Sequence, residues 1–443
     1  MDIAIIKTDC PEGAAAVCAL RDVLRKGDLT AGVETMDVRK VVREIIDYVE
    51  ALGDVAAAEI TSRLDNADIT PDTIRVPREL ITEAHSAADD EFLQLVRRVS
   101  SNIREYQESI LITDPQPLRR GGRTLGVRYT PMARAGVYVP GGKAIYPSTV
   151  LMTIVPAQVA GIEQIAIASP PTGGEINRMV LALAGELGIA EVYRLGGAVA
   201  IAAMALGTET VVPVDKIVGP GNAFVAEAKR QLFGRVGIDS VAGPSEVLIV
   251  ADQTARADYL AADMLAQVEH NPGSAILVTP SGELAEAVRG ELDEQLPTLE
   301  RSDAARVCLE AYGGIIVTAD LDEACRIAND FATEHLQIIT ADDRGALDKI
   351  RNAGAVFLGP HTPVPLGDYY AGPSHVLPTG GTAKFSGPLS CNDFLTAASI
   401  LSYDAESLDS DAADVIDFAT REGLTAHANA VRIRTQQSPP DDK

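Results

Sequence analysis

The feature that most constrains this chain of 443 residues is a regular alternation of short apolar runs and helix-like segments, which extends from residue 118 to residue 358. The helix-like segments carry apolar residues at three- and four-residue spacing, and glycine and proline punctuate the ends of the apolar runs. Parallel strands are typically continuous apolar runs, because helices bury both faces of their sheet. The alternation therefore predicts an α/β protein with helices packed on parallel sheets.

The predicted strands fall into two consecutive groups along the chain. The first group consists of residues 150–155, 165–168, 192–195 and 216–218, and the second of residues 246–250, 274–278, 314–317, 336–339 and 355–358. Helical periodicity also marks residues 38–53, 77–112, 255–269, 321–331 and 412–434. After about residue 390 strand-like runs are no longer visible, so we expect a helical C-terminal region.

Composition excludes several classes of partner. The chain has 38 basic and 63 acidic residues, a formal net charge of −25. Such a surface repels phosphate backbones and anionic membranes, so we expect neither nucleic acid nor membrane as a partner. The most apolar stretch, residues 148–169, contains Pro156, Gln158 and Glu163, which favours a buried strand and helix over a membrane span. Five cysteines without a CxxC pair indicate reduced thiols and a cytoplasmic protein.

Four of the six histidines lie in short polar clusters, all of them in the second half of the chain. Histidine titrates near neutrality and is a frequent metal ligand, so these clusters point to metal-assisted proton transfer. The clusters are Gln267 with His270, Glu334 with His335, Asp368 with His375, and Glu422 with His427. The first pair ends a predicted helix, where three-residue spacing places both side chains on one face.

Each cluster also has a plainer interpretation. His270 would suit the dipole at a helix C-terminus, and Glu334 with His335 would suit a solvated loop before a strand. The glycine-rich segment between Asp368 and His375 would suit an ordinary surface loop, and His427 an ordinary helical position. The donor types, nitrogen and oxygen without sulfur, are compatible with Zn²⁺, Mn²⁺ or Co²⁺. No HExxH motif is present, so spacing alone does not establish a metal site.

Glycine-rich turns form a second constellation. They are residues 139–143, 195–197, 219–222 and 243–246, and each adjoins a predicted strand. Glycine lets backbone amides approach a phosphate closely, but none of these turns matches G-x-G-x-x-G. The turns therefore allow a nucleotide site without demonstrating one.

Six ordered blocks of the sequence resemble the histidinol dehydrogenase family. The resemblance extends from Asp37 to Arg434 and rests on GVYVPGGKAIYPSTVLM, VDKIVGPGNAFVAEAKR, DSVAGPSEVLIVAD, FATEHLQI, GPSHVLPTGGTA and EGLTAHANAV. It implies two incomplete Rossmann-like parallel-sheet domains, a helical N-terminal arm and a small helical C-terminal domain. The implied ranges are 1–27 for the arm, 28–137 with 245–389 for the first α/β domain, 138–244 for the second, and 390–443 for the C-terminal domain.

The resemblance also implies chemistry and assembly. It implies a homodimer with shared active sites, in which Gln267, His270 and Asp368 of one chain and His427 of the other bind zinc. The implied reaction oxidises L-histidinol through bound L-histidinal to L-histidine and reduces two NAD. Within it, Glu334 activates water and His335 is the general base. The implied substrate contacts are Ser245, Gln267, His270, His335, Asp368, Glu422 and His427.

The first α/β domain would carry most of the metal and catalytic site, and the second would bind NAD. Tyr138 and Asn222 match positions that line the NAD site. Val199 stands where the family usually has glutamine. Valine cannot make a hydrogen bond that is typically worth about 0.5–1.5 kcal/mol, so we expect weaker NAD binding.

Two alternatives remain open at the level of sequence. A paralogous zinc- and NAD-dependent dehydrogenase would act on another small polyol, such as a sulfonated propanediol. No additional arginine appears in residues 422–427 or in GPSHVLPTGGTA to receive a sulfonate, which favours histidinol. The second alternative is a catalytically silent zinc-binding relative, which the presence of every expected ligand and of both expected catalytic residues disfavours.

Overall fold

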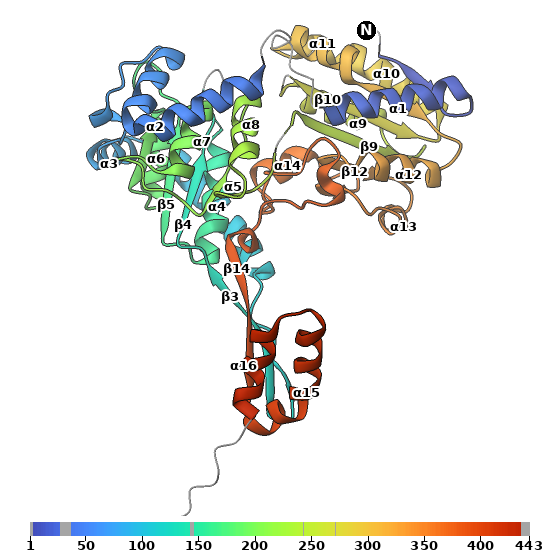
Figure 1. Cartoon of the computed structure of the whole chain (residues 1–443). Helices are drawn as coiled ribbons and strands as arrows, with labels where there is room; N and C mark the ends of the chain where they lie inside the picture. Colours follow the sequence, from blue (N-terminus) through green and yellow to red (C-terminus); the bar gives the residue numbers. More distant parts are fainter. Residues whose placement is uncertain (1–2, 27–36, 142–145, 242, 271, 436–443) are drawn as a thin grey trace, which may run out of the picture. The chain divides into compact units, whose positions relative to one another are not determined.

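The computed structural model describes residues 3–26, 37–141, 146–241, 243–270 and 272–435 (Figure 1). Contacts divide the chain into two compact units. Unit 1 comprises Met1–Ile110 and Met132–Phe394, and unit 2 comprises Leu111–Pro131 and Leu395–Lys443. Among the helices that the structure describes, none combines the length and apolar character needed to cross a bilayer.

Unit 1 contains a six-stranded sheet in which every pair of neighbours is parallel. Its order is β1-β11-β10-β9-β12-β13. The strands are β1 (Ile5–Lys7), β9 (Ser245–Ala251), β10 (Gly273–Thr279), β11 (Gly314–Val317), β12 (His335–Ile339) and β13 (Ala355–Leu358). The five strands predicted from residues 246–358 are therefore confirmed, whereas β1 was not predicted.

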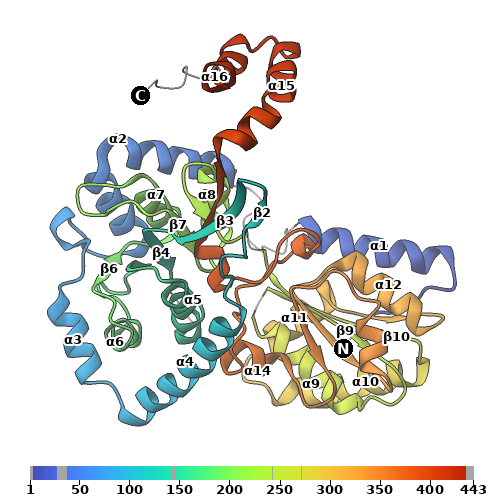
Figure 2. The same cartoon turned by 90° about the horizontal axis from the view of Figure 1, so that it is seen from below.

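Helices cover both faces of this sheet, which is why its strands are apolar throughout. On β9, Val247 and Ile249 face one core, and Leu248 and Val250 face the other. The first core is completed by α9 (Ala257–Val268), α10 (Gly282–Gln295) and α11 (Ser302–Tyr312). The second is completed by α1 (Pro11–Lys26), α12 (Leu321–Phe331) and α13 (Asp343–Leu347). In Figure 2 the strands lie between α1 and α12 on one side and α9 and α10 on the other.

Unit 1 also contains a five-stranded parallel sheet of order β6-β5-β4-β7-β8. Its strands are β4 (Arg134–Tyr138), β5 (Gln164–Ser169), β6 (Glu191–Arg194), β7 (Lys216–Val218) and β8 (Gly237–Ile238). Its helices are α2 (Val38–Asp65), α3 (Arg78–Ser86), α4 (Asp90–Ile110), α5 (Pro147–Ala160), α6 (Arg178–Glu186), α7 (Gly197–Leu206) and α8 (Ala223–Leu232). The prediction of two parallel-sheet α/β arrangements is confirmed.

Two expectations for this region were wrong in detail. Residues 150–155, predicted as a strand, lie inside α5, which Pro147 begins and Gly161 ends in a left-handed conformation. A fully buried helix is apolar all round, so periodicity alone does not distinguish it from a buried strand. Residues 37–110, grouped with the first α/β domain by the sequence, pack instead on the five-stranded sheet, because α2 shares a core with α7 and α8.

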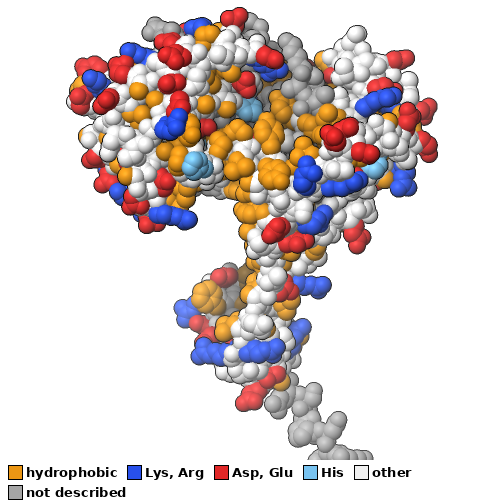
Figure 3. Space-filling view, turned by 180° about the vertical axis from the view of Figure 1, so that it is seen from behind, with side chains coloured by type: hydrophobic (Ala, Val, Ile, Leu, Met, Phe, Trp, Pro, Cys, Tyr) orange, Lys and Arg blue, Asp and Glu red, His pale blue; other side chains and the backbone are white. Residues whose placement is uncertain are grey.

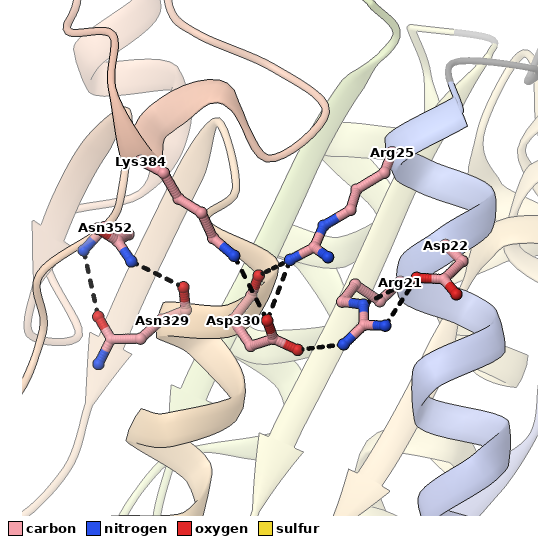
Figure 4. Close-up of polar contacts among 7 residues, drawn as sticks. All are labelled: Arg21, Asp22, Arg25, Asn329, Asp330, Asn352 and Lys384. Carbon is pink, nitrogen blue, oxygen red and sulfur yellow. Dashed lines mark hydrogen bonds and ion pairs between the residues drawn. The ribbon is translucent and has the colours of Figure 1, made fainter.

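Short elements complete unit 1. They are α14 (Val364–Tyr369) and the 3-10 turns η1 (Pro71–Thr73), η2 (Leu296–Thr298), η3 (Thr382–Lys384) and η4 (Cys391–Phe394). A charged cluster fastens α1, the predicted N-terminal arm, to the six-stranded sheet (Figure 4). The Asp330 carboxylate at the end of α12 forms ion pairs with Arg21 and Arg25 of α1 and with Lys384 of η3. The arm and Lys384, which follows the GPSHVLPTGGTA block, therefore share one carboxylate.

Residues 390–443 were expected to be helical, but unit 2, which contains most of them, also includes a sheet. Its antiparallel strands have the order β14-β3-β2. They are β2 (Leu118–Arg120), β3 (Arg123–Pro131) and β14 (Leu395–Tyr403), followed by α15 (Ala405–Arg421) and α16 (Thr425–Thr435). The nine residues of β14 pair along the whole length of β3. Because that partner lies far upstream in the sequence, local pattern did not reveal the strand.

The acidic composition is distributed over the surface. Figure 3 shows Asp and Glu side chains spread across the face in view, with Lys and Arg among them. This distribution agrees with a role for the net charge in solubility.

Candidate functional site

The candidate site lies at the amino ends of two neighbouring strands of the six-stranded sheet. Ser245 begins β9 and His335 begins β12, and the register pairs His335 with Val247. Glu334 precedes β12, and its Oε2 accepts hydrogen bonds from the Ser245 hydroxyl and, at 3.0 Å, from the Glu246 amide. The Glu334 carboxylate is therefore fixed by two donors from the neighbouring strand.

His335 is enclosed, with its side chain 3% exposed. Its Nδ1 lies 3.2 Å from the Glu246 carbonyl oxygen, and its Nε2 lies 3.6 Å from Oδ1 of Asp368. Burial lowers the pKa of His335, but the Glu334 and Asp368 carboxylates outweigh it and raise the pKa to about 9. The two carboxylates therefore stabilise the imidazolium that forms when this ring accepts a proton.

Asp368 lies near the end of α14 and joins His335 to His375. Burial alone would raise the pKa of Asp368, but the neighbouring imidazole of His335 holds the pKa below its usual range. The Asp368 carbonyl oxygen is 3.0 Å from Nδ1 of His375, and Nε2 of His375 is 3.2 Å from the Thr149 hydroxyl. Burial lowers the pKa of His375, which favours its neutral form.

Gln267 and His270, the pair predicted at the end of a helix, lie close to Ser245 and Asp368. Nε2 of Gln267 donates to the Ser245 hydroxyl at 2.6 Å. Oε1 of Gln267 is buried and has no hydrogen-bond partner among the described residues. Gln267, His270 and Asp368 line one hollow together, and His270 and Asp368 also line the larger cavity beside it. The predicted pair Gln267 and His270 thus shares one hollow with Asp368, which is distant from it in the sequence.

The cavity beside this hollow, the first cavity, has a volume of about 410 Å³ and is lined by residues from both α/β arrangements of unit 1. Ser245, His270, Glu334, His335 and Asp368 line it with the turn that follows β7. Such a volume suits a small metabolite. None of the lining residues that the structure describes is Lys or Arg.

A second cavity, of about 940 Å³, lies at the carboxyl edge of the five-stranded sheet. Strand order reverses between β4 and β7, and ligands of open α/β sheets bind at such switch points. Tyr138 ends β4, and its hydroxyl accepts from the Gly197 amide at 3.1 Å. Val199 lines this cavity, and Asn222, the N-cap of α8, lines both cavities. The sequence-predicted cofactor residues therefore share one cavity.

The two sheets present opposite edges to the site. The candidate catalytic residues precede β9 and β12, whereas the second cavity follows β4 and β7. Glu334 and His335 lie at the amino end of a parallel strand, and not at the carboxyl end where α/β enzymes usually place such groups.

Glu422 and His427 belong to unit 2, where both are exposed around the start of α16. In the described part of the chain, no three His, Cys, Asp or Glu side chains are grouped closely enough to hold a metal ion. One proposed ligand is a glutamine, which is outside these residue types, and another belongs to unit 2. The proposed ligand set therefore stays a prediction.

Sequence reasoning missed Glu246, whose backbone contacts both candidate catalytic residues. Its side chain is buried and Oε1 accepts from the Gly380 amide at 2.6 Å. Burial and the charge of Glu334 raise its pKa to about 8. A signal was present, because Glu246 is the one charged residue of the otherwise apolar run 246–250.

Comparison with known proteins gives one consistent result. The family model described as histidinol dehydrogenase matches residues 30–435. Histidinol dehydrogenase from Rhodopirellula baltica is 48% identical over 437 residues, which are 96% of this chain and 95% of that protein. The Bacillus subtilis enzyme of that name is 46% identical over 93% of this chain and 96% of its own length.

A solved structure agrees with the sequence relatives. The histidinol dehydrogenase from Elizabethkingia anophelis superposes with a TM-score of 0.90 and 31% sequence identity. The superposition covers 98% of each chain.

Proposed function

Because the chain belongs to the histidinol dehydrogenase family, a family of oxidoreductases of histidine biosynthesis, we propose that it oxidises L-histidinol to L-histidine with NAD as acceptor. One alcohol, one water and two NAD⁺ would give one carboxylate, two NADH and three protons. The observation that carries the proposal is the grouping of Ser245, Glu334, His335 and Asp368 around one cavity of small-metabolite size.

The residues present fit a zinc ion. Gln267, His270 and Asp368 would supply an amide oxygen, an imidazole nitrogen and a carboxylate oxygen, donor types that zinc accepts. The unpartnered buried Oε1 of Gln267 supports this assignment, because a buried acceptor without a partner is costly and coordination would remove that cost. We propose His427 of the partner subunit as the fourth ligand of a site shared within a homodimer.

Bound zinc would supply a fixed cation that orients the imidazole and amino nitrogens of the substrate. Proton transfer would be the task of His335, as general base for the substrate hydroxyl in the first oxidation and for the aldehyde hydrate in the second. The carboxylates of Glu334 and Asp368 would stabilise the imidazolium that each transfer forms. Burial of the ring restricts proton exchange with bulk water.

Hydration of the aldehyde would be the task of Glu334. The Ser245 hydroxyl and the Glu246 amide hold one of its oxygens, so the carboxylate has a fixed orientation. A fixed carboxylate accepts a proton from water and thereby activates it for attack on the carbonyl carbon. Enclosure of the intermediate in the cavity would protect it from side reactions.

NAD would occupy the second cavity, between Tyr138, Val199 and Asn222. Asn222 lines both cavities, so a dinucleotide there would extend toward the substrate. The nicotinamide would accept the hydride in both steps. Glu422 would contact the substrate, together with His427, from the partner subunit.

The absence of Lys and Arg from the described lining of the substrate cavity favours histidinol over a sulfonated diol, because a sulfonate needs a cationic partner. We further propose a cytoplasmic location, which suits five cysteines that form no disulfide in the described part of the chain.

The test is the number of NADH formed per L-histidinol consumed, with limiting substrate and zinc-loaded protein. Two NADH per histidinol, lost on chelation and restored by zinc, would establish substrate, metal and four-electron chemistry together. Turnover of a sulfonated or other small diol with none of histidinol would reject the substrate. No turnover of either with zinc loaded would favour a silent relative.

A further inference from the structure

A buried ion pair lies beneath the turn that joins the two cavities. Nζ of Lys229, on α8, is 2.7 Å from Oδ1 of Asp239, and the side chains are 3% and 4% exposed. Removing two charges from water is costly, so replacing a buried ion pair by apolar residues is often neutral or stabilising. Overall stability therefore does not account for this pair.

The pair holds one residue, Gly219, through both of its backbone groups. The Gly219 amide donates to Oδ2 of Asp239 at 2.7 Å, and Nζ of Lys229 donates to the Gly219 carbonyl oxygen. Oδ1 of Asp239 also accepts from the Ser240 amide at 2.7 Å. The ion pair is thus saturated with hydrogen bonds to the backbone that surrounds the cavities.

Any side chain at position 219 would be strained and would clash with the neighbouring backbone. Its φ is +114°, and a Cβ there would lie 2.2 Å from the Tyr138 carbonyl oxygen. The turn consequently lies directly against the end of β4, where the second cavity begins. A backbone held in such a conformation needs specific partners to keep it there.

Residues of this turn line the two cavities. Gly219 and Gly221 line the first cavity, and Asn222 lines both. The Asn222 side chain accepts from the Phe224 and Val225 amides and so begins α8, the helix that also carries Lys229. The charged pair and the cap therefore fix the turn from its two ends.

We propose that Lys229 and Asp239 are positioning residues for the dinucleotide, which hold the Gly219–Asn222 turn in the shape that binds it. This inference rests on the proposed NAD-linked function. Lys229 lines neither cavity, and Asp239, which lines the first cavity, has both carboxylate oxygens bonded to Lys229 or to backbone amides. The contribution of the pair is to place the backbone and Asn222, because small displacements of binding groups are costly in affinity.

The experiment measures NAD affinity by calorimetry for the zinc-loaded protein and for Lys229→Met/Asp239→Leu, which removes both charges. We expect this variant to keep its fold and zinc content, and its Kd for NAD to rise about 10- to 100-fold. Asp239→Asn keeps an oxygen acceptor for Gly219, and we expect an intermediate Kd. If the double variant does not fold, the proposal is tested by the Kd of Asp239→Asn for NAD. A Kd equal to that of the wild type would overturn the proposal.

The matched control is Arg134→Met/Glu191→Leu, which removes another enclosed ion pair of the same sheet, with side chains 6% and 24% exposed. Neither residue lines the two cavities. We expect wild-type NAD affinity in this control even if its melting temperature falls. Equal loss of NAD affinity in both double variants would overturn a specific positioning role. Failure of the wild type to oxidise histidinol would instead reject the proposed function, because the comparison of Kd values does not use that substrate.

Discussion

Nε2 of His335 lies 3.6 Å from Oδ1 of Asp368 and has no hydrogen-bond partner among the described residues. The opposite nitrogen of the ring is 3.5 Å from Glu334. The imidazole is therefore enclosed between two carboxylates. Asp368 is a proposed zinc ligand, and Glu334 is proposed to activate water. Their combined charge stabilises the cation that a general base becomes.

Replacement of this base should slow turnover strongly without unfolding the site. We expect His335→Gln to lower kcat about 10²- to 10⁴-fold, the usual contribution of a general base. Zinc content and NAD affinity should stay at wild-type values. His85→Gln is the matched control, because His85 bonds to Glu186 away from both cavities. Wild-type kcat in His335→Gln would exclude the assigned role.

Glu334→Gln should separate the two oxidations. The amide retains an oxygen for Ser245 and Glu246 but accepts no proton from water, so we expect the aldehyde step to slow about 10²- to 10⁴-fold. The measurement compares NADH formation from L-histidinol with that from added L-histidinal. Loss of the alcohol step alone would contradict the assignment.

Gln267 should govern metal retention. We expect Gln267→Leu to weaken zinc binding about 10- to 100-fold, because an oxygen donor is removed. Gln267→Glu retains an oxygen and should keep zinc at one equivalent. The measurement is the zinc content of both variants after dialysis against a weak chelator. Full zinc in the leucine variant would remove Gln267 from the ligand set.

Val199→Gln should tighten the cofactor site. Restoring one hydrogen bond, worth about 0.5–1.5 kcal/mol, would lower the Kd for NAD about two- to tenfold. Val199 is 1% exposed, so Val199→Leu serves as the control for added volume. Equal effects of the two substitutions would show that volume, and not hydrogen bonding, is responsible.

Glu246 should make stability depend on pH. Its pKa is raised from 4.5 to about 8 in the folded state, so the folded protein holds this proton more tightly than the unfolded chain. The contribution of this group to stability is therefore lost as pH rises from about 5 to 8, by at most about 1.4 kcal/mol per pH unit. Glu246→Gln keeps an acceptor for Gly380 and removes the dependence. The melting temperature of Glu246→Gln, relative to that of the wild type, should therefore rise as the pH increases from 5 to 8. The same difference in melting temperature at pH 5, 6.5 and 8 would contradict the assignment.

Much of the fold was predictable from the pattern of the chain. The strands that begin at Ser245 and His335 are apolar on both faces, and their pattern indicated parallel pairing. The same reasoning failed for α5, because complete burial removes the periodicity that marks a helix. It also failed for β14, whose pairing partner β3 lies some 270 positions upstream, as in the pair Leu395 and Pro131.

Residue types and short spacings determined by themselves which side chains could carry chemistry, since scarce histidines beside acids and amides restrict the possibilities. Gln267 with His270 and Glu334 with His335 were both visible in this way. Only the tertiary structure decided that Ser245 links Gln267 to Glu334, that Glu246 contacts both catalytic candidates, and that Lys229 and Asp239 hold Gly219. The physical reason is that local pattern records burial and periodicity, whereas these contacts depend on strand order and register between segments distant in the chain.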